Sequence, residues 1–525
     1  MPKSPLVPLA LAMLLLLGSP AHAADRDAPK DAAGTAQADK DGKQDELPIP
    51  PERSVVTHHR VSIDGHAVSY KATAGTLLIK DDKGKPTVSV FYVAYTVDKG
   101  GNDKASRPLT FMYNGGPGSS SMWLHMGSFG PMRVANKGDQ PIPPPPYQTV
   151  PNQYSLLDKT DLVFIDAPGT GYSRLVGAAK GKDFYGVDQD ADAFAKFITR
   201  YVSDHHRWNS PKFLFGESYG TTRSAVLVKR LQDQGMAFNG VVLMSSILDF
   251  SVWANTGVDH AFIVNLPTEA AIAWYHDRIP NKPADIASFL ADVRHFADTD
   301  YTLALAKGDA LEPAEADRIA NRLSHYIGLS PTYLKDANLR VDPSRFRKEL
   351  LRDQRRTVGR LDGRFEGIDP DAAGETPDGD AASDAATGAY LAAFNQYAAS
   401  ELKFTDDSAY LPNNYAVINR GWDWKHKSGR GFGFMQAPYV GADLADAMRR
   451  NPHLKVFSAN GYYDLATPFH ATEFDLDHLA LDPAIARNIE FGFYPSGHMI
   501  YFDVDALKQL KADLARFYDE AAPSS

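Results

Sequence analysis

The chain has 525 residues, of which 43% are apolar and 23% are charged, and this is the composition of a globular protein. Its length allows one large domain with insertions or about two to four ordinary domains. The formal net charge is −10 and no dense basic cluster occurs, which argues against nucleic acid as a partner. The sequence contains no cysteine, which excludes disulfides, thiolate metal sites and catalytic thiols.

Residues 1–23 have the pattern of a secretory signal peptide. Lys3 supplies the positive start, residues 6–17 form an apolar stretch, and Ala21-His22-Ala23 is a small-x-small cleavage site. An apolar stretch of this length is too short to span a bilayer, which requires about 20 residues. We therefore expect export and a mature chain without membrane association. The absence of cysteine from an exported chain favours a bacterial periplasmic or extracellular location.

Residues 24–52 are rich in Ala, Asp and Lys and end in a proline-rich stretch, which predicts a flexible linker. From residue 55 to residue 97 apolar residues alternate with polar ones. Asp64-Gly65 and Lys83-Gly84 mark turns within this stretch, so it predicts an antiparallel meander.

Short apolar runs then alternate with longer helical stretches. The runs are residues 109–113, 162–165, 213–215, 241–244, 455–458 and 489–494, and two of the helical stretches are residues 189–204 and 504–520. This order predicts a mostly parallel central sheet with helices on both faces.

The strand pattern is interrupted in residues 251–437. This region contains amphipathic segments, such as residues 314–327, and an acidic stretch of Asp, Ala and Gly at residues 369–388, which predicts a mobile loop. Because strands resume afterwards, we interpret the region as a mainly helical cap over the C-terminal edge of the sheet, rather than as an independent second domain. The core would then comprise residues 53–250 and 438–525.

The most informative stretch is Gly216-Glu217-Ser218-Tyr219-Gly220, a G-x-S-x-G pattern between a buried strand and a predicted helix at residues 221–234. A serine on such a turn is held above the sheet, and the helix N-terminus directs backbone N–H groups toward the bond it attacks. The alternative interpretation is a glycine-rich turn with an incidental serine.

A serine nucleophile requires a histidine that accepts its proton and a carboxylate that orients the histidine. On this type of sheet the acid and the histidine follow the serine in that order. Asp464 and His498 each follow a late predicted strand, so we predict that Ser218, Asp464 and His498 form the triad. His470 and His478 are nearby alternatives, and Asp475 and Asp477 lie on a predicted helix, where a solvated face is the ordinary explanation.

The glycine-rich segment at residues 114–118 directly follows the first short run. We predict that the backbone N–H groups of Gly116 and Tyr219 form an oxyanion hole. The alternative, a phosphate-binding loop, is not supported because the Walker lysine and the dinucleotide spacing are both missing. The histidine pairs of the sequence have no ligand-spaced companions, so we expect neither a metal nor a cofactor.

Together these segments resemble the serine carboxypeptidase family. The resemblance is carried by Asp464 and by residues 114–121, 152–173, 216–220 and 497–499. It implies an α/β-hydrolase fold and an exopeptidase that releases C-terminal residues from peptides or proteins through an acyl-enzyme on Ser218. It also implies that Asn114, Gly115 and Glu217 bind the terminal carboxylate of the substrate.

Glu217 lies in a partly buried turn, so its pKa should be raised, and in the protonated form it could donate to a carboxylate. Peptide cleavage should therefore favour acidic pH. Ser128 stands where the family often has a glutamate, which leaves the strength of this preference open. The alternatives are an esterase or acyltransferase on the same scaffold, or a catalytically silent binding protein. The sequence carries no signal for an oligomeric state.

Overall fold

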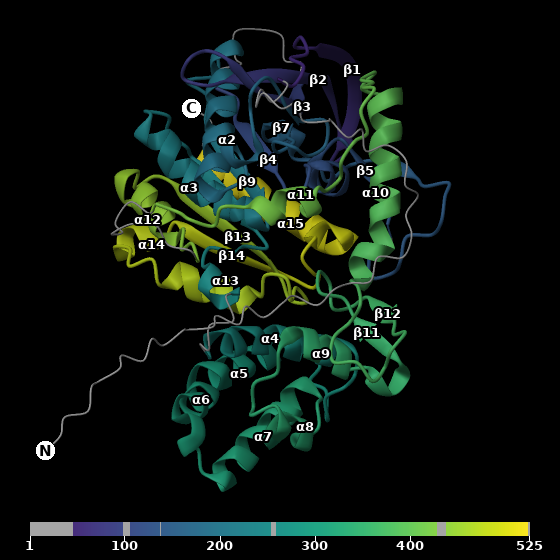
Figure 1. Cartoon of the computed structure of the whole chain (residues 1–525), viewed down its shortest axis with the longest axis vertical. Helices are drawn as coiled ribbons and strands as arrows, with labels where there is room; N and C mark the ends of the chain where they lie inside the picture. The colour runs from purple at the N-terminus through teal and green to yellow at the C-terminus, as the bar shows by residue number, and fades with distance from the viewer. Residues whose placement is uncertain (1–45, 98–105, 137, 254–258, 428–436, 523–525) are drawn as a thin grey trace, which may run out of the picture. The chain divides into compact units, whose positions relative to one another are not determined.

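The computed structural model of the chain describes residues 46–97, 106–136, 138–253, 259–427 and 437–522 (Figure 1). The predicted signal peptide and residues 24–45 of the predicted linker lie outside these ranges. Among the described residues, no helix is both long enough and apolar enough to cross a membrane.

A mixed, mostly parallel sheet is the centre of the fold. Strands β1 (Ser54–Ile63), β2 (His66–Lys80) and β3 (Pro86–Val97) form the antiparallel meander that the sequence predicts. Strand β3 pairs antiparallel with β7, and from β7 onwards the neighbours are parallel, in the order β7-β4-β9-β10-β13-β14. The parallel strands are β4 (Leu109–Tyr113), β7 (Asp161–Ile165), β9 (Lys212–Glu217), β10 (Gly240–Met244), β13 (Lys455–Gly461) and β14 (Ile489–Tyr494).

Helices cover both faces of the sheet because its central strands are apolar on both sides. Every residue of β4, β7, β9 and β10 is buried. One face packs against α2 (Val187–Asp204), α3 (Tyr219–Asp233) and α12 (Gly441–Arg450). The other face packs against α15 (Val504–Ala521) and α10 (Ala381–Ser400). Parallel strands joined by helices on both sides confirm the predicted fold class, and the fold is that of an α/β-hydrolase.

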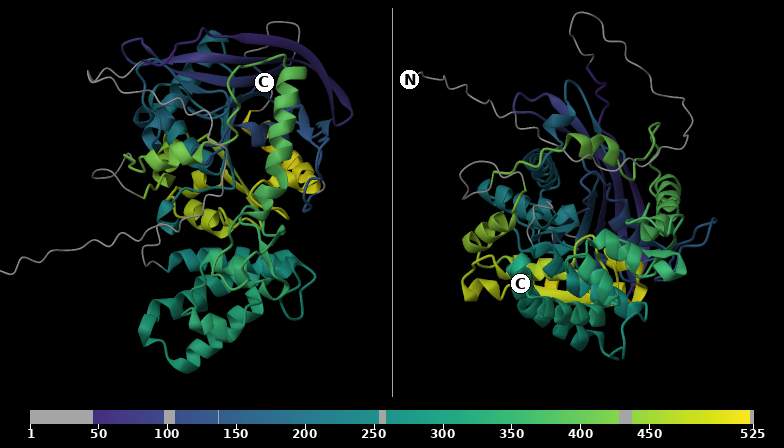
Figure 2. Two further views of the ribbon diagram at one scale, coloured as in Figure 1. Left: turned by 45° about the vertical axis from the view of Figure 1, so that its right-hand side comes forward. Right: turned by 60° about the horizontal axis from the view of Figure 1, so that its bottom comes forward.

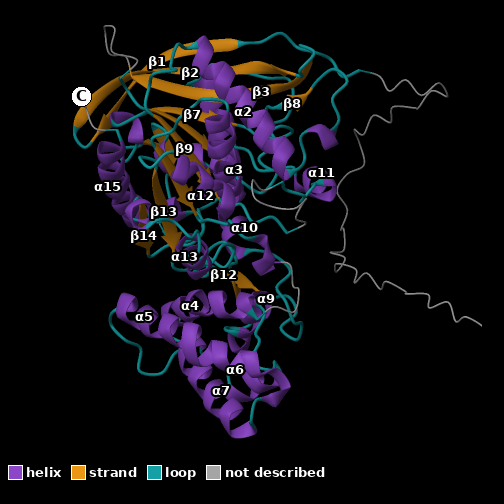
Figure 3. Cartoon of the chain, turned by 90° about the vertical axis from the view of Figure 1, so that its left-hand side faces the viewer, coloured by secondary structure: helices purple, strands orange, loops and turns teal. Residues whose placement is uncertain are grey.

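The described residues between β10 and β13 add no strand to the central sheet. Helices α4 to α9 share an apolar core, and Figure 3 shows them as a group beyond α13 (Phe469–Asp477). Figure 2 shows α10 apart from this group. The six helices are α4 (His260–Tyr275), α5 (Ile286–Phe296), α6 (Thr302–Lys307), α7 (Pro313–Ile327), α8 (Pro331–Asp336) and α9 (Pro343–Glu349). The segment is mainly helical, and the boundaries of a cap at residues 251 and 437 stay a prediction.

The predicted mobile loop at residues 369–388 is wrong at its C-terminal end, where α10 begins at Ala381. Asp380 caps this helix, and its carboxylate accepts hydrogen bonds from the backbone N–H groups of Ala382 (3.0 Å) and Ser383 (3.2 Å). Alanine is the strongest helix former, so the Asp–Ala composition continues a helix once an aspartate has capped it. At the other end of the stretch, Asp369 is buried and forms an ion pair with Lys348.

The remaining elements are short. A π-helical turn, η2 (His125–Phe129), directly follows α1 (Met122–Leu124) after the glycine-rich segment. The other strands and helices are β5 (Met132–Val134), β6 (Thr149–Pro151), β8 (Arg174–Leu175), β11 (Arg356–Val358), β12 (Glu366–Ile368), α11 (Tyr415–Ile418) and α14 (Pro483–Ala486).

Candidate active site

Ser218 lies between the end of β9 and the start of α3, at the turn that the G-x-S-x-G pattern predicts. Its backbone has φ 60° and ψ −131°, a region that residues other than glycine rarely occupy. Gly216 permits this turn, because a Cβ at that position would overlap with the carbonyl group of Gly220. The side of the turn that carries Ser218 is partly exposed, whereas both neighbouring residues are buried. The serine is thus accessible at the C-terminal edge of the sheet.

Asp464 and His498 form a buried hydrogen-bonded pair. The Nδ1 atom of His498 lies 2.8 Å from Oδ2 of Asp464, although the residues come from loops after different strands, β13 and β14. The Asp464 carboxylate also accepts from the backbone N–H groups of Ala466 (2.8 Å) and Thr467 (3.0 Å), and from Oγ1 of Thr467 (2.6 Å). Because a carboxylate only accepts, it keeps the proton of neutral His498 on Nδ1 and leaves Nε2 as the basic atom.

The electrostatics of this pair favour a protonated histidine. Burial opposes the charged imidazolium, but the carboxylate of Asp464 raises the pKa of His498 above its ordinary value. Glu217 acts in the same direction, whereas the charge of Arg360 opposes it. His498 is therefore suited to accept a proton as a nucleophile forms and to return it to a leaving group.

Strand order explains how three distant residues come to one edge. Strands β9, β10, β13 and β14 are adjacent and parallel, so the residues that follow them lie along the same edge of the sheet. Ser245 follows β10, and its hydroxyl donates to the backbone carbonyl of His498 (2.6 Å). The backbone N–H of Ser218 donates to the carbonyl of Met244 at the end of β10 (3.0 Å).

The glycine-rich segment after β4 lies against the serine turn. A Cβ at Gly115 would overlap with the backbone nitrogen of Tyr219, so only glycine allows this approach. Gly116 adopts φ 109°, in the region that favours glycine. The ring of Tyr415, from α11, borders Gly116, and its hydroxyl lies 2.6 Å from Oγ of Ser119. The two segments that carry the predicted oxyanion donors are therefore in contact.

Glu217 is buried beside Ser218, with 3% of its surface exposed. Burial raises the pKa of its carboxyl to about 7, and hydrogen bonds from Tyr501 and Asn114 counteract part of this rise. The Tyr501 hydroxyl lies 3.0 Å from Oε2 and 3.3 Å from Oε1. The side-chain oxygen of Asn114 accepts the backbone N–H of Leu124 (3.0 Å), which leaves its amide group as the donor. The raised pKa agrees with the expectation from the sequence.

Tyr501 was not among the residues that the sequence indicates. It lies three positions after His498, and its proximity to Glu217 depends on a tertiary contact. The turn η2 shapes that contact, because a Cβ at Gly127 would overlap with the Tyr501 ring. Ser128, in the same turn, donates to the carbonyl of Leu124 (2.6 Å). Tyr501 therefore bonds to Glu217, whereas the Ser128 hydroxyl has a backbone partner.

Arg223 holds the backbone of Asn114 in place, and the sequence did not indicate it either. Its guanidinium is buried, donates to the backbone carbonyl of Asn114 (2.7 Å), and forms an ion pair with Asp190 of α2 (2.6 Å). The arginine lies in α3, five residues after Ser218, so the helix that begins at the nucleophile also holds the asparagine in place. A buried arginine of this kind gives no local sequence signal.

The alternative acid and histidine residues on α13 have other partners. His470 lies between Asp298 (2.9 Å) and Glu473 (2.9 Å). The prediction of a solvated face is wrong for Asp475, which is buried, whereas Asp477 is exposed. Of the two histidines, His470 is buried and His478 is exposed. In the part of the chain that the structure describes, no group of three or more potential ligands is arranged to hold a metal ion.

Part of the chain is similar in sequence to known proteins. Residues 64–300 match the model of the family described as serine carboxypeptidase. The pheromone-processing carboxypeptidase KEX1 of Saccharomyces cerevisiae is 30% identical over 146 residues, which are 26% of this chain and 19% of that protein. Serine carboxypeptidase-like 45 of Arabidopsis thaliana is 27% identical over 205 residues, which are 37% of this chain and 40% of that protein. The matched segments thus span less than half of each relative.

Solved structures are similar over most of their length but at low identity. A proline iminopeptidase from Mycobacterium smegmatis is 14% identical, with 85% of this chain and 98% of that chain covered and a TM-score of 0.37. Est816, an enzyme that degrades N-acyl homoserine lactones, is 12% identical, with 84% and 100% covered and a TM-score of 0.35. The fold assignment rests on the strand order given above. The family match and the two carboxypeptidase relatives show that part of the chain is similar to the serine carboxypeptidase family.

Proposed function

We propose that the protein is a serine-type carboxypeptidase that releases C-terminal residues from peptides through an acyl-enzyme on Ser218. The observation that carries the proposal is the buried carboxyl of Glu217 next to the nucleophile, with its pKa raised to about 7. Below this pH the carboxyl is neutral and can donate a hydrogen bond to a substrate carboxylate. A carboxylate that is ionised at all working pH values would repel the same group.

In acylation, Nε2 of His498 takes the proton of the Ser218 hydroxyl while Oγ attacks the carbonyl carbon of the last peptide bond. Asp464 holds the imidazole and stabilises its positive charge. The N–H groups of Gly116 and Tyr219 stabilise the oxyanion, and loss of one such donor typically costs about 3–4 kcal/mol. His498 then donates the proton to the leaving amine as the C–N bond breaks, which releases the C-terminal residue.

In deacylation, a water molecule attacks the ester carbon and His498 takes its proton. The bond between Oγ of Ser218 and the acyl carbon breaks, and Oγ recovers the proton from His498. The shortened peptide leaves with a new carboxylate. No step requires a cofactor or a redox partner.

The terminal carboxylate of the substrate would be bound by Asn114, Gly115 and Glu217. Two hydrogen bonds support this arrangement: one occupies the side-chain oxygen of Asn114, so that its amide group is the donor, and one joins Tyr501 to Glu217. The match of residues 64–300 to the serine carboxypeptidase family supports a peptide as the substrate. The signal-peptide pattern of residues 1–23 supports an exported location, periplasmic or extracellular in a bacterium.

The decisive experiment compares a blocked dipeptide that has a free C-terminal carboxylate with its C-terminal amide, at about pH 6. We expect the amide to lose most of the kcat/KM, because it has no charge for the carboxylate site. Equal rates on both substrates would favour the esterase or acyltransferase alternative. A fluorophosphonate that fails to label Ser218 would favour the silent binding protein, and Ser218→Ala is the control for labelling.

A further inference from the structure

Residues 360–364 lie between the short strands β11 and β12 and contact the loop that carries Asp464. The backbone carbonyl of Arg360 accepts the N–H of Leu465 (3.1 Å), and the N–H of Gly363 donates to the carbonyl of Tyr463 (2.9 Å). Both chain neighbours of Asp464 are therefore hydrogen-bonded to this segment. The segment comes from the region between β10 and β13, not from the loops of the central sheet.

The same segment contacts the loop that carries His498. The backbone N–H of His498 donates to the carbonyl of Leu361 (2.6 Å), and the N–H of Gly497 donates to Oδ2 of Asp362 (3.1 Å). Ser245, after the core strand β10, donates to the carbonyl of His498. The backbone of the histidine is therefore hydrogen-bonded to the core through its carbonyl and to residues 360–364 through its N–H.

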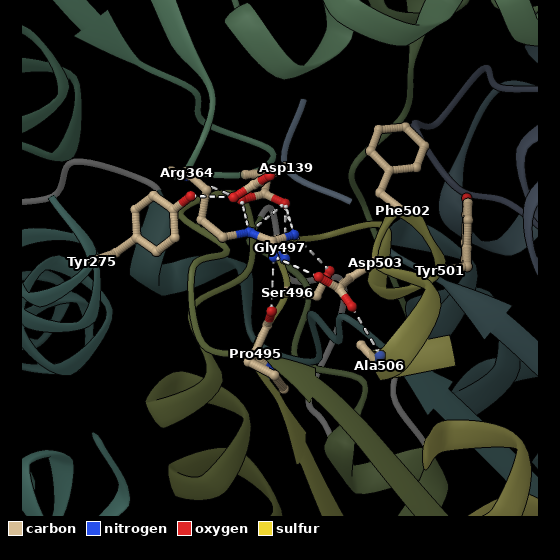
Figure 4. A network of polar contacts seen from close by, with 12 residues as sticks. Asp139, Tyr275, Arg364, Pro495, Ser496, Gly497, Tyr501, Phe502, Asp503 and Ala506 are labelled. Carbon is tan, nitrogen blue, oxygen red and sulfur yellow. Dashed lines mark hydrogen bonds and ion pairs between the residues drawn. The ribbon is translucent and has the colours of Figure 1, made fainter. Parts of the chain in front are cut away.

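A buried ion pair holds the segment in shape. Nη2 of Arg364 lies 2.8 Å from Oδ2 of Asp362, and both side chains are almost fully buried. Arg364 also donates to the carbonyl of Pro495 (2.9 Å) and to Oγ of Ser496 (3.2 Å), as Figure 4 shows. Its fourth partner, Asp503 (3.0 Å), caps α15. The guanidinium thus ties the histidine loop to the N-terminus of a core helix.

The contacts leave little room for movement. A Cβ at Gly497 would overlap with the side chain of Asp362, and a Cβ at Gly363 would overlap with Ile272 of α4. Figure 4 also shows Tyr275, from α4, bonded to Asp139 next to Arg364. The segment is therefore packed between the histidine loop on one side and the helical group on the other.

We propose that residues 360–364 position Asp464 and His498 relative to each other, so that the inserted region is a part of the catalytic centre. The inference rests on the proposed function for the roles of these two residues. The physical reason is that a misplacement of about 1 Å in a catalytic group can cost roughly 100-fold in rate. None of the five residues touches the substrate bond in this proposal, so all are positioning residues.

The test uses Asp362→Asn and Arg364→Met in the full-length protein, with Asp369→Asn as the matched control. Asp369 and Lys348 form an ion pair (2.6 Å) that is equally buried, and both side chains also hydrogen-bond to the backbone of Asp371. The readout is the second-order rate constant for labelling of Ser218 by a fluorophosphonate, a small probe that needs no carboxylate site. Each rate is measured well below the Tm of the variant.

We expect labelling by the Asp362 and Arg364 variants to fall roughly 10- to 100-fold. The control variant should lose a similar amount of Tm but label within about twofold of wild type. Arg364→Lys should keep the charge and recover part of the rate, and it provides a milder variant if Arg364→Met does not fold. If both segment variants label as fast as Asp369→Asn, the inference is overturned.

A pH profile separates positioning from general loss of stability. The charged groups that face His498 are Asp464, Glu217 and Arg360. A loosened contact with Asp464 lowers the pKa of His498, so the midpoint for labelling should move to lower pH in the segment variants only. An unchanged midpoint would contradict the proposal. A wild-type protein that does not label would instead overturn the proposed function, and this inference with it.

Discussion

At the scale of single residues, Glu217 and Ser218 are neighbours with opposite surroundings. Ser218 is partly exposed at the edge of the sheet, whereas Glu217 is buried and bonded to Tyr501. The buried neighbour would select the end of the substrate, and the exposed one would attack it. Two substitutions test this division.

Substitution of Glu217 by Gln keeps the shape of the side chain and removes its titration. In wild type, kcat/KM for a peptide with a free carboxylate should fall as the pH rises through about 7, where Glu217 ionises. The expected slope is about tenfold per pH unit. The Gln variant should lack this alkaline limb, and an ester without a carboxylate should lack it in both proteins. The assignment fails if the limb persists in Glu217→Gln.

Substitution of Tyr501 by Phe removes a donor that stabilises the ionised form of Glu217. The pKa of Glu217 should therefore rise, and the alkaline limb for a peptide acid should move up by as much as about one pH unit. The matched control is Tyr390→Phe, since the buried Tyr390 hydroxyl has no hydrogen-bond partner among the described residues. A limb that moves equally in both variants, or moves down, would show that Tyr501 does not set this pKa.

At the scale of elements, side chains of helices α2 and α3 hold the backbone of Asn114 in the proposed carboxylate site. Asp190 of α2 neutralises Arg223 of α3, which in turn donates to the backbone of Asn114. Both members of the ion pair are buried, so removal of the aspartate leaves an uncompensated charge in the core.

We predict that Asp190→Asn lowers the free energy of unfolding by about 3–5 kcal/mol, measured by urea denaturation. Asp192→Asn is the control on the same helices, because Asp192 is exposed in its ion pair with Arg230 (2.6 Å) and the pair should contribute less than about 1 kcal/mol. A loss of similar size in both variants would contradict the burial argument. Because Arg223 contacts Asn114, Asp190→Asn should also raise KM for a peptide acid.

At the scale of the whole molecule, His426 joins segments that are distant in the chain. Its ring is buried between Asp188 of α2 (2.8 Å) and Asp443 of α12 (2.7 Å). Burial alone would lower its pKa, but the hydrogen bonds and charges of the two carboxylates raise it to about 9. His470, which joins α13 to Asp298 and has a pKa raised to about 8, acts in the same way.

The raised pKa values of His426 and His470 make the free energy of unfolding depend on pH. The folded-state pKa of His426 lies above the unfolded value of about 6.5, so its contribution is complete below pH 6.5 and is lost as the pH rises through 9. We expect His426→Gln to remove about 2–3 kcal/mol of this pH-dependent loss between pH 6.5 and 9.5, measured by denaturation. Equal slopes in wild type and His426→Gln would refute the prediction.

Much of the architecture is predictable because its signals are local. Buried strands such as β4 and β9 appear as short apolar runs, and the turn at Ser218 has a five-residue pattern. The order of serine, acid and histidine then follows from the topology of parallel sheets. Burial of Glu217 follows from its place between a buried strand and a helix, so its raised pKa was predictable in direction.

Other features depend on long-range packing and give no local signal. Tyr501 meets Glu217 across 284 positions of the chain, and Asp362 meets Gly497 across 135. The acidic stretch at residues 369–388 shows that a local signal can also mislead. Its composition is typical of a mobile loop, yet Asp380 caps a helix that begins within it. Periodicity and motifs therefore specify the strands, the serine turn and the residue types of the proposed triad. The partners that set pKa values and hold the loops come together when the sheet and the inserted helices pack, because side chains far apart in sequence then share one buried volume.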